Sequence, residues 1–146
     1  MNSKKITETI NIDKYFFSDS KNEMILMNKN DLLLAGNKGI IIIDIQEKKI
    51  IKKINLSTPG YLSYIFKLTN NILITGHWHN YIEQWEYDEV KKEIKVISCT
   101  KTKEPFGSGV LFDISSISIF NNKLIISPYD NSLDNSSLII YKYKNI

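Results

Sequence analysis

One seven-residue phrase occurs three times in this chain of 146 residues. It reads NDLLLAG at 30–36, NNILITG at 70–76 and NKLIISP at 122–128. An asparagine-containing turn is predicted at the start of each copy, at 28–30, 70–71 and 121–122, because asparagine tolerates positive φ and bonds to its own backbone. A unit that returns after about 40 to 50 residues predicts a repeat architecture in which each copy needs neighbours.

Each copy extends in both directions into further strand-like segments. An apolar stretch precedes the phrase at 24–27, 64–68 and 117–120, and another follows it at 40–44, 82–86 and 138–142. The first two copies end in alternating, lysine-rich segments at 48–55 and 91–98, as expected of an outer edge protected from pairing. This order predicts an all-β fold of four-stranded antiparallel β-propeller blades, in an incomplete ring of about three blades where about four to eight are usual.

The chain is predicted to be a single repeat region over 1–146, with blades at 23–56 and 61–100 and three strands of the last blade at 112–143. The outer strand of that last blade is predicted at 4–12. The reason is that residues 4–11 match residues 48–55 at both lysines, both isoleucines and the asparagine.

The strand ends resemble those of the WD-repeat family. Trp85-Glu86 is similar to the Trp-Asp dipeptide of that family, and residues 39–44 with the turn at 45–49 resemble its third strand and following turn. Thr75 and Ser127 fall where the family has its second-strand hydroxyl, but no Gly-His pair precedes a first strand. A complete tetrad of Trp, Ser or Thr, His and Asp is therefore not expected. The resemblance implies a propeller that acts as a protein-interaction scaffold.

In a propeller, the turns between second and third strands and the loops between blades share one face, which makes a ready binding surface. Trp78 is the first candidate there, because tryptophan is enriched among interface hot spots; alternatively, it folds back onto its own blade. Trp85 is expected in the core. The predicted partner-binding residues are Lys38, His77, Trp78, His79, Tyr129 and Asp130.

Two histidines offer the main hint of site chemistry. His77 and His79 point the same way in an extended segment and could reach one metal, but a zinc centre needs at least a third protein ligand. We therefore expect no metal and no cofactor. No nucleophile elbow, paired-acid motif or phosphate-binding glycine loop occurs, so a non-catalytic role is expected. The alternative is a propeller enzyme or a metal-dependent binder that uses His77 and His79.

All 19 basic residues are lysine, and the formal net charge is +3. Without arginine, the chain lacks the side chain best suited to bidentate phosphate or guanine contacts, so nucleic acid is not an expected partner. No run reaches the roughly 18 apolar residues of a membrane helix, and the start lacks a signal-peptide core. We expect a cytoplasmic protein with a protein partner. It is either part of a longer propeller or a homodimer that completes a six-bladed ring.

Overall fold

The computed structural model describes residues 9–10, 12, 23–36, 39–56, 62–77, 81–101, 113–121, 123–129 and 139–142. All regular structure in these residues is β-strand, which confirms the all-β prediction. No helix long and apolar enough to cross a bilayer occurs in the described ranges.

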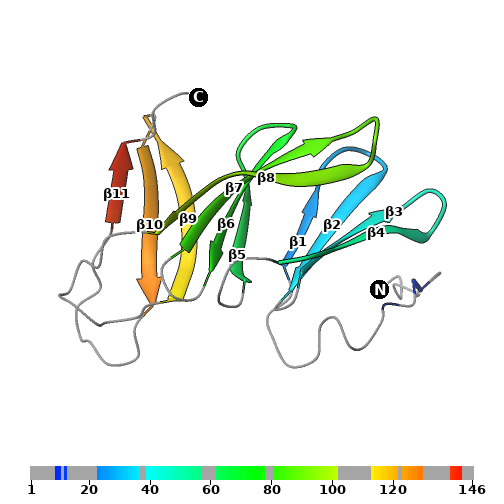
Figure 1. Cartoon of the computed structure of the whole chain (residues 1–146), viewed down its shortest axis with the longest axis horizontal. Coiled ribbons are helices and arrows are strands. Elements are labelled where there is room, and N and C mark those ends of the chain that lie inside the picture. Colours follow the sequence, from blue (N-terminus) through cyan, green and yellow to red (C-terminus); the bar gives the residue numbers. More distant parts are fainter. Residues whose placement is uncertain are drawn as a thin grey trace, which may run out of the picture.

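The described strands form three antiparallel sheets, each built from consecutive strands in spatial order (Figure 1). The first sheet contains β1 (Glu23–Leu26), β2 (Asp31–Gly36), β3 (Gly39–Asp44) and β4 (Lys49–Asn55). The second contains β5 (Leu62–Lys67), β6 (Ile72–His77), β7 (Tyr81–Asp88) and β8 (Glu93–Lys101). The third contains β9 (Asp113–Phe120), β10 (Lys123–Tyr129) and β11 (Ile139–Lys142).

The second copy of the repeated phrase is displaced by one residue from the alignment that its first asparagine suggests. In the first sheet, the N–H of Ile45 donates to the carbonyl of Asn30 at 2.7 Å. The corresponding bond in the second sheet runs from the N–H of Tyr87 to Asn71, also at 2.7 Å. Asn30 therefore corresponds to Asn71, not to Asn70. Successive side chains of a strand point to opposite faces. This one-residue shift therefore places each side chain of β6 on the face opposite to the one that the first alignment predicts.

Side-chain oxygens close the turns between the first and second strands. Asn28 Oδ1 accepts hydrogen bonds from the N–H groups two and three residues further on, both at 2.8 Å. Thr69 Oγ1 accepts the equivalent bonds in the second sheet, at 3.4 and 3.1 Å. In the third sheet, Asn121 has a φ of 48°. The predicted asparagine chemistry is confirmed at Asn28 and Asn121, whereas threonine replaces it in the second sheet.

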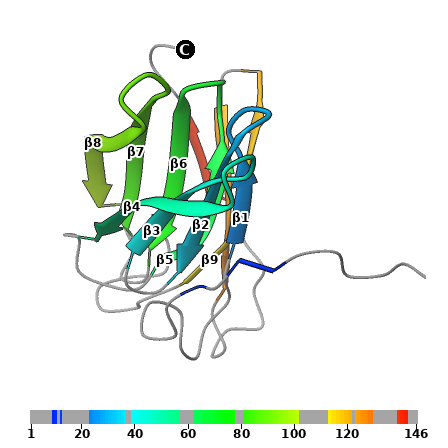
Figure 2. The same cartoon turned by 90° about the vertical axis from the view of Figure 1, so that its right-hand side faces the viewer.

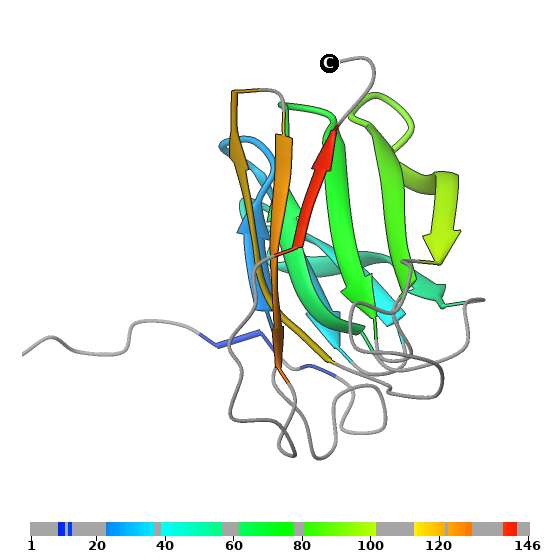
Figure 3. The same cartoon turned by 90° about the vertical axis from the view of Figure 1, so that its left-hand side faces the viewer.

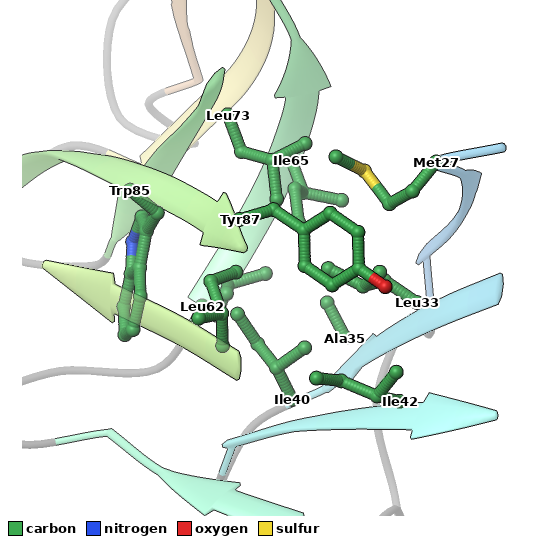
Figure 4. Close-up of a cluster of buried hydrophobic side chains, with 11 residues drawn as sticks. Met27, Leu33, Ala35, Ile40, Ile42, Leu62, Ile65, Leu73, Trp85 and Tyr87 are labelled. Atoms are coloured by element: carbon green, nitrogen blue, oxygen red, sulfur yellow. The ribbon is translucent and has the colours of Figure 1, made fainter. Parts of the chain in front are cut away.

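The three sheets stack face to face in chain order, with β5 in contact with both β1 and β9 (Figures 2 and 3). The second sheet is covered on both sides because adjacent residues of β6 serve different neighbours. Leu73 packs in a cluster with Leu33 and Ile42 of the first sheet (Figure 4). Ile74 packs with Ile126 of the third sheet.

A third cluster lies on the outer face of the first sheet. Leu34, Ile41 and Ile43 are buried there, and Ile10 and Ile12 pack against them. Of the predicted outer strand at 4–12, residues 9, 10 and 12 are described and none belongs to a strand. The rest of that segment lies outside the described residues, so its pairing stays a prediction.

Candidate functional site

Along the sequence, the residues predicted to bind a partner lie at or just after the ends of three strands that end at the same edge of the three sheets. This loop edge is defined by the ends of β2, β6 and β10 at Gly36, His77 and Tyr129 (Figure 1). The backbone of Tyr129 and the whole of His77 are described. The other candidates lie outside the described residues: Lys38, Trp78, His79 and Asp130.

The structure buries His77 completely, with 0% of its surface exposed. His77 is the last residue of β6, paired with Tyr81, and not part of the turn. It shares one face of the strand with Leu73 and Thr75, and Leu73 packs against the first sheet. We therefore correct the prediction that His77 contributes to an accessible partner-binding surface.

His77 belongs to a buried polar network with Thr75, Glu83 and Trp85. Trp85 Nε1 donates to Thr75 Oγ1 at 2.9 Å. Thr75 Oγ1 and His77 Nε2 are 2.7 Å apart, and the imidazole tautomer decides which one donates. His77 Nε2 also lies 3.0 Å from Glu83 Oε2. None of the four side chains is more than 2% exposed, so the network belongs to the interior.

The contact between His77 and Glu83 is electrostatic and lacks the alignment of a hydrogen bond. Glu83 Oε2 has no aligned donor within the described part of the chain, and His77 Nδ1 has no partner there either. A carboxylate taken out of water loses several kcal/mol of hydration unless a nearby group compensates it. The imidazole of His77 is the polar group that the structure places beside this carboxylate, so removing the imidazole exposes Glu83 to that cost.

This network differs from the WD-repeat tetrad of Trp, Ser or Thr, His and Asp, because its acid is Glu83 and the contact between His77 and Glu83 is not a hydrogen bond. Its histidine and its acid come from within the second and third strands, not from the loop and turn positions of a WD repeat. The sequence signal for this network is the spacing of its members. Thr75 and His77 are two residues apart on one strand, and Glu83 and Trp85 are two apart on the next, so the members of each pair lie on the same face of their strand. Trp85, 2% exposed, confirms the predicted core position. Within the described ranges, no three potential ligands are grouped to hold a metal.

A second polar cluster joins the first sheet to the second at the edge opposite the loop edge. The carboxylate of Asp31 is 0% exposed. Its Oδ2 accepts hydrogen bonds from the Tyr87 hydroxyl at 2.7 Å and from Asn28 Nδ2 at 2.6 Å, and it pairs with the Lys92 ammonium. Asn28 Nδ2 also donates to Glu89 Oε1 at 2.8 Å. This cluster is not predictable from a short segment of sequence, because Asp31 and its partners Tyr87 and Lys92 are distant in the chain.

The cluster shifts the ionisation of two of its members. Burial alone would raise the pKa of Asp31, but the hydrogen bonds from Lys92, Tyr87 and Asn28 outweigh it and hold that pKa below its usual value. Burial, followed by the hydrogen bond to the Asp31 carboxylate, raises the pKa of Tyr87. The ionised aspartate and the neutral phenol are thus the forms that the folded state favours.

Asp31→Asn is expected to lower the free energy of unfolding by about 2–3 kcal/mol near pH 7, because hydrogen bonds to a charged acceptor are lost. A folded pKa below the unfolded value of 3.8 stabilises the protein above that value, and the benefit disappears as pH falls through the folded pKa. The difference between wild type and variant should therefore shrink below pH 3.8. Urea unfolding at several pH values measures it. A difference independent of pH would contradict the ionised role.

A solvent-open depression of about 710 Å³ lies beside the turn between β7 and β8. Its lining carries charges of both signs that neutralise one another. Lys95 lies 2.8 Å from Glu86, and Lys52 lies 2.5 Å from Glu93. The depression therefore presents no concentrated charge that would select an ionic ligand.

The loop edge offers one described aromatic and cationic pair. Tyr81 begins β7 and is half-buried, while Lys101 ends β8 and is exposed. The Lys101 ammonium lies 6.0 Å from the centre of the Tyr81 ring, within the range of a cation–π contact. Tyr81 is the strand partner of His77 on one side and of Lys101 on the other, which places this pair at the loop edge.

Comparison with known proteins gives a similarity of fold. No family model and no curated protein matches the sequence. Among solved structures, the chain is similar to Raptor of Chaetomium thermophilum, with a TM-score of 0.50 and 13% sequence identity. The match covers 79% of this chain and 11% of the Raptor chain, so the chain spans a small part of that protein.

Proposed function

We propose that this chain is a non-catalytic protein–protein interaction or scaffold module of the WD-repeat-like β-propeller type, with each sheet serving as one blade. The observation that carries the proposal is the consistent stacking of the sheets. Leu33 and Ile74 hold corresponding places in β2 and β6, and each faces the next sheet along the chain. Face-to-face stacking of consecutive sheets is what neighbouring propeller blades require, and it therefore supports the proposal. The similarity of fold to a part of Raptor supports an arrangement of sheets that also occurs in a larger protein.

The polar groups of the interior support a scaffold more than a catalytic site. Thr75, His77 and Glu83 are 0–1% exposed, and His77 contacts both of the others, so a substrate has no access to them in this conformation. The alternative, an enzyme or a metal-dependent binder using His77 and His79, has less support because Thr75 and Glu83 already engage His77 Nε2.

The binding surface in this proposal is the loop edge. It combines the described pair Tyr81 and Lys101 with the remaining predicted residues, Lys38, Trp78, His79, Tyr129 and Asp130. We place the module in the cytoplasm. The one cysteine, Cys99, is exposed, and exposed thiols persist in reducing compartments.

Trp78→Ala is expected to weaken binding of a protein partner by about 30-fold, because truncation of a hot-spot tryptophan costs about 2 kcal/mol or more. The partner is isolated from a native lysate with the wild-type chain and identified by mass spectrometry. Its Kd for each variant is then measured by calorimetry with purified components.

The matched control is Val90→Ser, at a 93% exposed position in the turn between β7 and β8, away from the loop edge. It should leave the Kd unchanged. If Trp78→Ala binds as wild type does, the partner does not use Trp78. A wild-type chain that retains no partner would contradict the interaction module itself.

The proposal includes self-association. The outer face of the first sheet corresponds to the face of the second sheet that packs, through β6, against the first sheet. The outer face of the third sheet corresponds to the face of the first sheet that packs, through β2, against the second sheet. Two copies joined head to tail would therefore repeat the packing already present within the chain and complete a six-bladed ring.

A further inference from the structure

The outer face of the first sheet is built like an interior face. In the alignment of the first two sheets set by their backbone hydrogen bonds, the pair Leu34 and Ile41 corresponds to the pair Thr75 and Glu83. Thr75 and Glu83 are 0% and 1% exposed, and they lie on the face of the second sheet that packs against the first. The first sheet therefore carries, on its outer side, a face whose counterpart is a contact between two sheets.

Two isoleucines cover part of this outer face. Ile10 and Ile12 pack against Leu34, Ile41 and Ile43, which are 0–5% exposed. Figure 1 shows the described residues of this segment, in dark blue, beside the first sheet at the end of the stack. We call Ile10 and Ile12 the isoleucine cap, because they lie on the side of the first sheet that corresponds to the side of the second sheet on which another sheet packs.

The isoleucine cap leaves the β1 part of the same face open. Met24 and Leu26 are 66% and 52% exposed. They pair with Leu34 and Leu32 of β2, and paired residues on neighbouring strands point to the same face. In the second sheet, by contrast, the counterpart of Met24 is Ile65, which is 4% exposed. The outer face therefore combines a capped part with an open apolar part, and exposed apolar area of this kind marks a contact site.

The isoleucine cap makes less contact with the face than a packed sheet makes. Ile10 and Ile12 are half-buried, and residues 9, 10 and 12 belong to no strand among the described residues. At the junction of the first two sheets, fully buried side chains from both sheets interlock (Figure 4). Because hydrophobic stabilisation grows with the apolar area removed from water, a sheet from another molecule can replace the cap once that molecule is concentrated enough.

The third sheet supplies a matching apolar surface. Phe120 and Ile140 are 65% and 58% exposed. Ile119 and Leu124 pack toward the second sheet, so Phe120, one step from Ile119, points away from it. Ile140 pairs with Ile125, one step from Leu124, and points away as well. The partner that repeats the packing between the sheets of this chain is therefore a second copy, docked through its third sheet.

We infer that the isoleucine cap restrains self-association: while Ile10 and Ile12 lie on the first sheet, they block the third sheet of a second copy, and their displacement opens the face. This inference rests on the proposed self-association and adds its regulation. The measured Kd of the dimer then equals the intrinsic Kd divided by the fraction of chains whose face is open.

Sedimentation equilibrium over a range of concentrations tests the restraint. In Ile10→Asn/Ile12→Asn, the apolar contacts of the cap are lost and the face is open in more chains, so the Kd of the dimer should fall by about tenfold or more. Ile10→Ala and Ile12→Ala, made singly, should act in the same direction with a smaller effect. The matched control is Thr9→Asn, because Thr9 is exposed in the same segment, and it should leave the Kd unchanged.

A change on the opposite surface separates docking from non-specific aggregation. Phe120→Lys/Ile140→Lys places charges on the outer face of the third sheet. Combined with Ile10→Asn/Ile12→Asn, it should return the chain to a monomer, because a buried lysine without a partner charge opposes docking. A dimer that persists in this combination would overturn the inference, since the second copy would then use another surface.

Nuclear magnetic resonance of the wild-type chain follows the cap directly. With isoleucine and leucine methyl groups labelled, Ile10 and Ile12 should show nuclear Overhauser effects to Leu34 and Ile43 in dilute samples. These contacts should disappear as the dimer forms at higher concentration. The measurement does not depend on how well the substituted chains fold.

Methyl contacts that persist in the dimer, or a dimer Kd that is unchanged or higher in Ile10→Asn/Ile12→Asn, would overturn the restraint but leave the self-association intact. Chains that stay monomeric at every concentration, with the cap present and with it removed, would overturn both. Neither outcome affects the loop-edge test, which depends on Trp78.

Discussion

His77→Ala is expected to lower the free energy of unfolding by about 3–5 kcal/mol, because it leaves the carboxylate of Glu83 buried without its charged or polar neighbour. Glu83 is 1% exposed and Oε2 lies 3.0 Å from His77 Nε2. The substitution also removes the group 2.7 Å from Thr75 Oγ1. Urea unfolding near neutral pH, followed by circular dichroism, measures the loss.

Two further variants separate this effect from simple loss of volume. The double variant His77→Leu/Glu83→Leu removes both polar groups and keeps the site filled, so we expect it to be more stable than His77→Ala. Lys91→Ala breaks an exposed pair with Asp88 and should change stability by less than about 0.5 kcal/mol. If His77→Ala unfolds at the wild-type urea concentration, the structural role assigned to His77 is wrong.

Trp85→Ala is expected to cost about 3–5 kcal/mol, because it opens a cavity in the cluster that joins the first two sheets (Figure 4). Trp85→Phe retains much of the packing but loses the 2.9 Å bond to Thr75, so we expect a smaller loss of about 1–2 kcal/mol. Denaturant unfolding of both variants gives the comparison.

A double-mutant cycle assigns the part of this loss that belongs to the hydrogen bond. Thr75→Val removes the hydroxyl and keeps the side-chain shape. If Trp85 and Thr75 act through their bond, Trp85→Phe combined with Thr75→Val should cost less than the sum of the single changes. Strict additivity would contradict that coupling, and equal losses for Trp85→Phe and Trp85→Ala would contradict the packing role.

Several elements of the fold were predictable because their signals are local. The repeated phrases and their flanking apolar runs predicted an all-β chain, and the structure confirms it. Asparagine chemistry predicted the turns at Asn28 and Asn121 correctly. A tryptophan in an apolar strand column predicted a core position, and Trp85 has one. Each of these inferences needs only the conformational preferences of a few neighbouring residues.

The candidate site was less predictable because a shift of one residue in the alignment of the second copy with the first decides which side chains of β6 face inward. The first asparagine of each phrase suggested Asn70 as the counterpart of Asn30, whereas backbone hydrogen bonding selects Asn71. The apolar phrase alone does not separate the two alignments. In the folded sheet, β6 runs on to His77, and His77 faces inward between two sheets.

Local sequence therefore specified the strands, the turns and the repeat, since backbone propensity and side-chain alternation act over a few residues. Tertiary packing decided which face of each strand is covered. It also brought Asp31 together with Tyr87 and Lys92, and His77 together with Glu83, into clusters that no short segment encodes. These polar groups owe their partners to the stacking of sheets, because burial is what obliges a carboxylate or an imidazole to find a neighbour within the protein.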